Sequence, residues 1–305
     1  MSRRVYVAIQ TPDPEWEASL SADPDFPVEI VREPTEEWCR GLTPEDVVFF
    51  RSGFATEIPQ KNFAPFLRSV KILQDVGARI VNPPASTAFC MRKDFWYPKI
   101  AGAPPFFVDP SRREIEYAMA AGILSFPFVY RDAGGWGGRD TFLIQDWRQW
   151  DDNPLTERSD AHRIVVPYYE GIRFGGYYQR YRLHMIGGAC DVFGVLIGRS
   201  RTPLRLPAER DAKFVADFRE AQIVDRDKIA DEIAAIGDRV RIQLNIEVFA
   251  ADVIPVKQAP GLILTDVNPI YAYSPMEELY GPGSEAAKWR KGHFSRLVRW
   301  LHEKA

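Results

Sequence analysis

The chain has 305 residues, of which 46% are hydrophobic and 27% are charged, and its formal net charge at pH 7 is −3. Charge this close to balance creates no overall field, so the composition excludes strong attraction to nucleic acid or to an anionic membrane surface. Three cysteines without a CxxC pair and four scattered histidines exclude a disulfide framework and a zinc site. The apolar run near the start is too short for a signal segment or a membrane span, so we expect a cytoplasmic protein.

The first 84 residues alternate short apolar runs with helical stretches. Apolar runs at Val5–Ile9, Val47–Phe50 and Ala78–Val81 indicate buried strands, and Glu36–Cys39 and Asn62–Gly77 are predicted to be helices. Strand, helix and strand in this order are typical of an α/β unit whose helix packs on a parallel sheet. We therefore predict an N-terminal α/β domain over residues 1–84, because the Asn-Pro-Pro that follows the last strand breaks the pattern.

A second α/β segment is predicted over residues 85–165. It contains a helix at Ser111–Ala121 and strands at Phe126–Tyr130 and Thr141–Gln145, which are separated by a glycine-rich turn. A further strand at Arg163–Tyr169 leads out of this segment into another glycine-containing turn.

The last part of the chain, residues 166–305, begins with a hairpin at Tyr177–Gly198 around a Gly-Gly turn. A charged helical stretch at Ala208–Ile236 follows. Two apolar runs, Leu244–Pro255 and Leu262–Pro269, are joined by a Pro-Gly turn and predict a second β-hairpin. The chain closes with a predicted helix at Ser284–Lys304.

The second hairpin carries the most informative polar residues of the chain. Asp252 lies in its first strand, and Asp266 and Asn268 are two apart in its second, so they share a face while Val267 points the other way. Carboxylate and amide oxygens suit Mg²⁺, which takes one or two carboxylates together with substrate phosphates. The alternative interpretation is that these residues cap turns at strand ends.

The glycine-rich turn follows Arg131 and contains Gly134, Gly135, Gly137 and Gly138. Residues without Cβ atoms allow backbone N–H groups to approach phosphate oxygens, and Arg131 supplies a cation for the same phosphates. The turn matches neither GxGxxG before a helix nor a P-loop. A plain hairpin loop and a surface ion pair of Arg131 remain the alternatives.

The order and spacing of these features resemble the ATP-grasp superfamily, and within it the ribosomal-S6-modification and glutathione-synthetase-like ligases. The segments that carry the resemblance, spread over most of the chain, are Asn82-Pro83, Lys93, Pro127–Arg131, the glycine turn, Val165–Glu170, Tyr181–Gly188, Asp252 and Asp266–Asn268. The resemblance implies an ATP-grasp fold of mixed α/β (α+β) class. Its parts would be an N-terminal α/β pre-ATP-grasp domain, a small central α+β lid domain and a C-terminal α+β domain with an antiparallel sheet.

The resemblance also implies an activity, that of an ATP- and Mg²⁺-dependent carboxylate–amine ligase that works through an acylphosphate. Two Mg²⁺ ions are expected, with Mn²⁺ as a possible substitute, and Asp252, Asp266 and Asn268 would be their ligands. The nucleotide-binding residues implied are Lys93, Arg131, Gly134, Gly135, Gly137, Gly138, Tyr168 and Glu170. Arg182 and Arg199 would act on the acylphosphate. The partners expected are a small-molecule carboxylate and an amine, such as an amino acid or peptide, and a homodimer is possible.

Several positions depart from the family pattern. Arg131 stands where the family usually has lysine, and Asp266 stands where it has glutamate. An arginine keeps the charge but binds phosphate with a different geometry. Two alternatives therefore stay open: a catalytically altered nucleotide-binding regulatory module, and a phosphotransferase of the same fold. At single residues, Arg182 could be a cross-strand ion pair and Glu170 an exposed turn carboxylate. The acid and the amine are not identified by the sequence.

Overall fold

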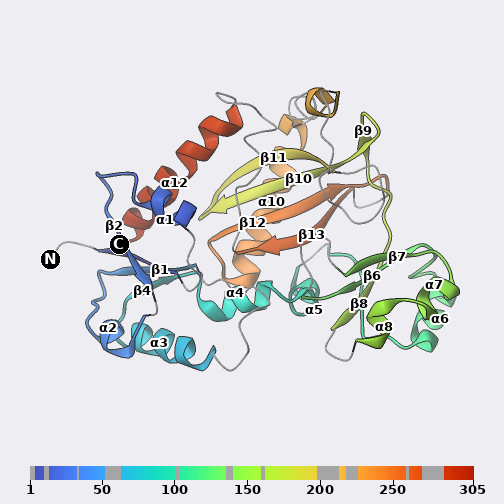
Figure 1. The fold of residues 1–305 in the computed structure, drawn as a ribbon, viewed down its shortest axis with the longest axis horizontal. Coiled ribbons are helices and arrows are strands. Elements are labelled where there is room, and N and C mark those ends of the chain that lie inside the picture. The colour runs from blue at the N-terminus through green and yellow to red at the C-terminus, as the bar shows by residue number, and fades with distance from the viewer. Residues whose placement is uncertain are drawn as a thin grey trace.

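The computed structural model describes residues 4–9, 14–32, 34–51, 63–100, 103–134, 140–158, 162–197, 213–217, 226–258, 261–269 and 285–305. The strands in these residues form three sheets, one in each third of the fold (Figure 1). No helix in the described ranges has the length and apolar character that crossing a membrane requires.

The N-terminal sheet is parallel, with strand order β2-β1-β3-β4. Its elements are β1 (Val5–Ile9), α1 (Pro14–Leu20), β2 (Val28–Arg32), α2 (Glu36–Arg40), β3 (Val47–Arg51), α3 (Phe63–Asp75) and β4 (Arg79–Val81). The three predicted strands and the two predicted helices are present. The edge strand β2 was not predicted, because it is only half-buried and Glu29 interrupts its apolar run.

The central sheet is antiparallel, with strand order β5-β8-β6-β7, and α4 and α5 lead into it from the N-terminal sheet (Figure 1). Its elements and those before it are α4 (Pro84–Cys90), α5 (Lys93–Trp96), the 3-10 turn η2 (Tyr97–Lys99), β5 (Phe107–Val108), α6 (Arg112–Ala120), β6 (Phe128–Asp132), β7 (Thr141–Ile144), α7 (Trp147–Asp151), α8 (Pro154–Glu157) and β8 (Arg163–Pro167). Helix α6 begins at the capping box of Ser111 and Glu114, which satisfies backbone donors of its first turn.

The C-terminal sheet is also antiparallel, with order β11-β10-β12-β13 and β9 paired to β10. Its elements are β9 (Arg173–Phe174), β10 (Tyr177–Ile186), β11 (Ala189–Ile197), α10 (Arg226–Leu244), β12 (Val248–Pro255), β13 (Leu262–Asn268) and α12 (Glu285–Lys304). Both predicted hairpins and the final helix are present. Residues 208–212 and 218–225 of the helical stretch predicted at Ala208–Ile236 lie outside the described residues. One predicted boundary was wrong: α10 continues past Ile236 to Leu244 and ends before Asn245, whose φ of 49° is left-handed, so the strand begins at Val248.

The two faces of the C-terminal sheet are covered by different elements. On one face, residues of β10 and β12 such as Leu183 and Phe249 pack with α10. On the other, Val248 and Ala250 join a core with Leu297 of α12 and with β1 and β3. The N-terminal sheet therefore shares a hydrophobic core with the C-terminal sheet, and α12 lies between them (Figure 1).

Asn82 links the same two sheets through its side chain. It is buried directly after β4 with a φ of 51°. Its amide donates to the carbonyl oxygen of Val248 at 2.5 Å and accepts from the backbone N–H groups of Glu247 and Val248 at 2.9 and 3.0 Å. The end of β4 is thereby fixed to the start of β12.

Asn82→Ala is expected to lower the free energy of unfolding by roughly 2–3 kcal/mol, because buried N–H groups at the start of β12 lose their acceptor. Urea unfolding measures the change. Asn245→Ala is the matched control, since Asn245 has a similar φ of 49° but is exposed. Equal losses in the two variants would assign the effect to backbone conformation instead of to the hydrogen bonds.

Two buried histidines between the C-terminal sheet and α12 predict a loss of stability in mild acid. His184 of β10 and His293 of α12 have ring centroids 5.9 Å apart. Burial, and then the neighbouring His293 and Arg182, holds the pKa of His184 well below its usual value. Burial, together with Arg296, lowers the pKa of His293 to about 3.

Unfolding frees both imidazoles to take up protons below a pH of about 6.5, while the folded protein excludes these protons until the pH is far lower. Stability is therefore complete above that pH and falls as the pH decreases, by about 1.4 kcal/mol per pH unit for each histidine. Urea unfolding at pH 7.5 and 5.5 measures the loss. His293→Leu is expected to reduce the pH dependence, and an unchanged dependence would contradict this account.

Candidate functional site

A row of charged side chains crosses the C-terminal sheet. Arg182 of β10 is paired in register with Asp252 of β12, and Asp252 is paired with Asp266 of β13. Residues in register on neighbouring strands project from the same face, so the three side chains lie side by side. All three lie within strands, so Asp252 and Asp266 are not turn caps. A bulge follows Asp252, where the register of β12 and β13 shifts.

Asp252 is buried and forms ion pairs with two arginines. Its oxygens accept from Nε and Nη2 of Arg182 at 2.8 and 3.0 Å, and Nη1 of Arg180 lies 3.2 Å from Oδ2. Burial alone would raise the pKa of Asp252, but Arg180 and Arg182 hold it down at about 2. Burial lowers the pKa of Arg180, and Asp252 opposes that shift. One carboxylate therefore contacts both guanidinium groups.

Lys93 brings a cation to the other end of the row. Its side chain is 3% exposed, and Nζ lies 3.2 Å from Oδ1 of Asp266. Burial lowers the pKa of Lys93 to about 8, against the opposing effect of Asp266. The backbone N–H of Lys93 donates to the carbonyl oxygen of Ala133 at 3.1 Å. This bond ties α5 to the end of β6, directly before the glycine-rich turn.

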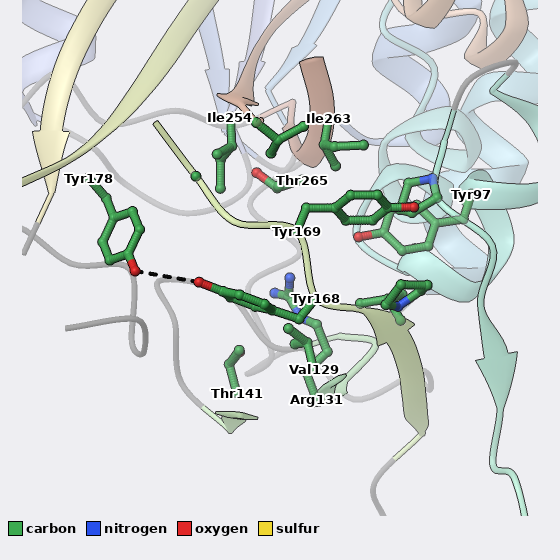
Figure 2. A pocket seen from close by; sticks show the side chains of 15 residues that line it. Tyr97, Val129, Arg131, Thr141, Tyr168, Tyr169, Tyr178, Ile254, Ile263 and Thr265 are labelled. Carbon is green, nitrogen blue, oxygen red and sulfur yellow. Dashed lines mark hydrogen bonds between the residues drawn. The ribbon is translucent and has the colours of Figure 1, made fainter. Parts of the chain in front are cut away.

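A pocket lies beside this row, between the central and C-terminal sheets (Figure 2). Its wall residues include Val129, Arg131 and Thr141 from β6 and β7, Ile254, Ile263 and Thr265 from β12 and β13, and the tyrosines Tyr97, Tyr168, Tyr169 and Tyr178. Aliphatic side chains therefore form two facing walls, and aromatic rings stand at their edges. A slot of this kind suits a flat aromatic ligand with one charged end toward Arg131.

The rim of the pocket is a connected polar network. The hydroxyl of Tyr168 donates to Oε2 of Glu170 at 2.9 Å. It also lies 3.4 Å from the hydroxyl of Tyr178, a contact drawn as a dashed line in Figure 2. The guanidinium of Arg173 stacks over the ring of Tyr178 at 4.0 Å and donates to its hydroxyl. Burial, with Tyr178 and Glu170, raises the pKa of Tyr168. The ring of Tyr168 is thereby oriented within the pocket.

The structure brings most of the predicted site residues together. Lys93, Arg182, Asp252 and Asp266 form the charged row, Arg131 and Tyr168 line the pocket, and Glu170 lies at its rim. Asn268 is paired with Ala250 on the face that carries Asp266, whereas Val267 is buried on the other face, as predicted.

The glycine-rich turn is described only at its ends. Gly134 follows β6, and its N–H donates to Oδ1 of Asp132 at 2.8 Å. Gly135, Gly137, Gly138 and Arg199 lie outside the described residues. Their predicted roles stay predictions.

Two features were missing from the predicted set. Arg180 stands two residues before Arg182 on the same strand face, a period-2 signal that was visible in the sequence. Tyr97 lies in the pocket wall through η2, and no local pattern marks it, because its position depends on how α5 docks against β6.

Within the described ranges, no three His, Cys, Asp or Glu side chains gather into a metal-holding group, so a metal here would also need amide or phosphate oxygens.

The sequence matches no protein-family model and no curated protein. Solved structures of similar fold are found. The D-cycloserine synthetase DcsG is 17% identical, with a TM-score of 0.61 over 98% of this chain and 99% of that one. The ATP-grasp ligase PsnB in complex with a minimal precursor, Mg and ADP is 13% identical, with a TM-score of 0.62 over 99% of both chains.

A third similar structure is the D-alanine–D-alanine ligase of Bacillus anthracis in complex with ATP. It is 12% identical, with a TM-score of 0.55 over 99% of this chain and 96% of that one. These likenesses extend over nearly the whole chain and include all three sheets described above. The chain has the ATP-grasp fold.

Proposed function

We propose that this protein is an ATP- and Mg²⁺-dependent ligase that joins a carboxylate to an amine through an acylphosphate. One observation carries the proposal: the charged row from Arg182 to Lys93 lies directly beside the tyrosine-lined pocket. If the base of a nucleotide occupied the pocket, its phosphates would extend along the charged row. Arg131 of the pocket wall lies near Lys93, so the two cations connect the pocket with the row. The similar structures are those of one synthetase and two ligases, which supports the same reaction class.

The base would lie between the aliphatic walls, with Tyr168 beside it and Glu170 near the ribose hydroxyls. Apolar walls remove the base from water, and the oriented ring of Tyr168 adds stacking area. The phosphates would meet Arg131 and Lys93. Lys93 is buried and Arg131 is half-buried, and a cation shielded from water interacts more strongly with phosphate than an exposed one.

The donors on β13 fit magnesium. Asp266 and Asn268 present oxygen atoms from one strand face, and Mg²⁺ in nucleotide sites commonly takes one or two carboxylates besides phosphate oxygens. When bound, the ion would neutralise charge on the transferred phosphoryl group. The proposal includes two ions, with Mn²⁺ able to replace Mg²⁺. Asp252 was predicted as a third ligand, and its oxygens contact Arg180 and Arg182.

The chain's own residues would act on the substrates in two steps. In the first, a substrate carboxylate attacks the γ-phosphorus of ATP, the bond to the β-phosphate oxygen breaks, and ADP and an acylphosphate form. In the second, an amine attacks the acyl carbon, loses a proton and releases phosphate as the amide forms. Arg182, joined by Arg199, would stabilise the negative oxygens in both steps.

The proposal is tested by incubating the protein with ATP, Mg²⁺ and pools of amino acids and other small carboxylic acids. ADP and phosphate release that requires both an acid and an amine, with an amide product found by mass spectrometry, is the expected result. Phosphorylated acid without amide would identify a phosphotransferase. Nucleotide binding without turnover in any pool would identify a regulatory module and overturn the ligase proposal.

Arg131→Ala is expected to weaken ATP binding by about tenfold or more, because a partly desolvated cation would be lost from the phosphates. Arg131→Lys keeps the charge and should retain most of the affinity. Isothermal titration calorimetry measures both, with Arg148→Ala as the control, since Arg148 lies exposed on α7 outside the pocket. Equal affinity in all the variants would remove Arg131 from the nucleotide site.

A further inference from the structure

We propose that Asp252 is a positioning residue that holds Arg180 and Arg182 as a subsite for phosphoryl oxygens, and that Asp266 and Asn268 bind Mg²⁺ without it. The proposal rests on the proposed function for the identity of the phosphoryl group. It differs from the role predicted for Asp252 in the sequence, where it was a third metal ligand. The difference follows from which atoms surround each carboxylate.

The oxygens of Asp252 are already largely engaged. A carboxylate offers about four lone-pair positions. Arg182 occupies one on each oxygen in a bidentate arrangement, at 2.8 and 3.0 Å. Nη1 of Arg180 forms an ion pair with Oδ2 at 3.2 Å. A metal ion bound to Asp252 would become a third cation around one carboxylate, which repulsion from both guanidinium groups disfavours.

Arg180 has little to replace Asp252. Its side chain is 17% exposed, and its Nε is buried without an acceptor among the described residues. The one ion pair that it makes there is with Asp252. If Asp252 turned toward a metal, Arg180 would lose its ion-pair partner and keep a partly desolvated charge stabilised only by the more distant Asp266, which is a costly state.

Asp266 differs from Asp252 on each of these points. Its one ion pair in the described part of the chain is with Lys93, through Oδ1 at 3.2 Å. It lies at the outer strand of the pair, next to Asn268 on the same face and near the pocket through Thr265. Asp266 and Asn268 therefore have oxygen atoms to offer a metal, whereas Asp252 serves the arginines.

The arrangement leaves the arginine cluster with one net positive charge, because Asp252 neutralises one of the two guanidinium groups. Arg182 is fixed in orientation by its two parallel hydrogen bonds, which limits the loss of side-chain entropy when it binds. Guanidinium groups held in this way suit a phosphoryl group with two or three charged oxygens. Inorganic phosphate, the product of the proposed reaction, is the simplest probe of such a subsite.

Charge-balanced double variants test the metal part of the proposal. Asp252→Asn with Arg180→Gln removes one negative and one positive charge, and Asp266→Asn with Lys93→Gln does the same at the other end of the row. Electron paramagnetic resonance measures Mn²⁺ bound in the presence of ADP. The first pair should keep the Mn²⁺ affinity within about threefold, and the second should lower it by about tenfold or more, the scale of losses at metal sites.

A tenfold loss of Mn²⁺ affinity in the Asp252→Asn, Arg180→Gln protein would overturn the proposal, since the net charge is unchanged and only a ligand is gone. The positioning role has its own readout. Asp252→Asn should weaken binding of inorganic phosphate to the protein with Mn²⁺ and ADP by about tenfold, and Asp252→Glu should recover part of it. Unchanged phosphate affinity in Asp252→Asn would overturn the subsite.

A stability measurement needs no ligand and separates this proposal from the proposed function. Asp252→Asn should lower the melting temperature because two half-buried cations lose the carboxylate between them, and adding Arg180→Gln should restore part of the loss. If Asp252→Asn raises the melting temperature, Asp252 does not hold the arginines and the proposal fails. If the parent protein binds no ADP with Mn²⁺, the proposed function fails, while this thermal comparison still decides the role of Asp252.

Discussion

Asp266→Asn and Asn268→Ala are each expected to lower Mg²⁺-dependent ATP turnover by about 10²–10³-fold, the scale of losing one preorganised charge-stabilising group, about 2.7–4 kcal/mol of barrier. Both side chains project from one face of β13 beside the pocket. Asp266→Asn removes the charge but keeps an oxygen that can accept from Lys93, so the buried ammonium retains a partner. ADP release under saturating ATP over a range of Mg²⁺ concentrations measures the effect.

Val267, the residue between Asp266 and Asn268, provides a control. Val267 points into the core on the opposite face, where it is 1% exposed. Val267→Ala should lower the melting temperature through lost packing while turnover by the remaining folded protein stays near that of the parent. If Asp266→Asn and Asn268→Ala keep full turnover and affinity for Mg²⁺, the metal does not bind to β13 and must be sought elsewhere.

The charged row could be predicted from sequence as far as local periodicity reaches. Asp266 and Asn268 are two apart in an apolar run, so their common face and the opposite orientation of Val267 follow from the pleat of any strand. The Pro-Gly turn predicted the hairpin with Asp252. What the sequence could not supply was the third strand: that Arg182 stands opposite Asp252 depends on the pairing of β10 with β12, whose residues are about 70 apart in the chain.

The burial of Lys93 could not be predicted from the local sequence either. In the sequence this lysine follows Arg92 and precedes Asp94, a run that is ordinary on a solvated surface. Its burial arises because α5 docks against the end of β6, where its N–H bonds to Ala133, so the side chain reaches Asp266 across the site. Tertiary packing decides such an environment, and only the family resemblance singled this lysine out.

The missed strand and the misplaced helix end have local physical causes. In β2 the apolar residues alternate with Glu29 over only three positions. The strand lies at the edge of its sheet, where its side chains are only partly buried. Leu244, Ile246 and Val248 alternate with the polar Asn245 and Glu247, which is the pattern of a strand, so periodicity alone extends the strand back into the end of the helix. Asn245 marks the boundary by adopting a left-handed conformation, which asparagine tolerates better than most residues.

Arg182→Ala is expected to lower kcat by about 10²-fold or more while leaving the dissociation constant of ATP within a few-fold of the parent, the pattern of an interaction made mainly in the transition state. The reason is its position. Arg182 lies on β10, two strands away from Asp266 and outside the pocket wall, where its two bonds to Asp252 orient it toward the row in which the phosphoryl group would transfer.

Single-turnover kinetics and calorimetry with ATP separate the two quantities for Arg182→Ala and for Arg182→Lys. Lysine should recover only part of kcat, because a point charge cannot make the two parallel bonds that fix the guanidinium on Asp252. If Arg182→Ala loses ATP affinity and keeps kcat, the arginine is a nucleotide ligand and the phosphoryl subsite lies elsewhere. If it changes neither, the Arg182–Asp252 pair is structural, and Arg180 becomes the candidate for the group that stabilises the developing charge.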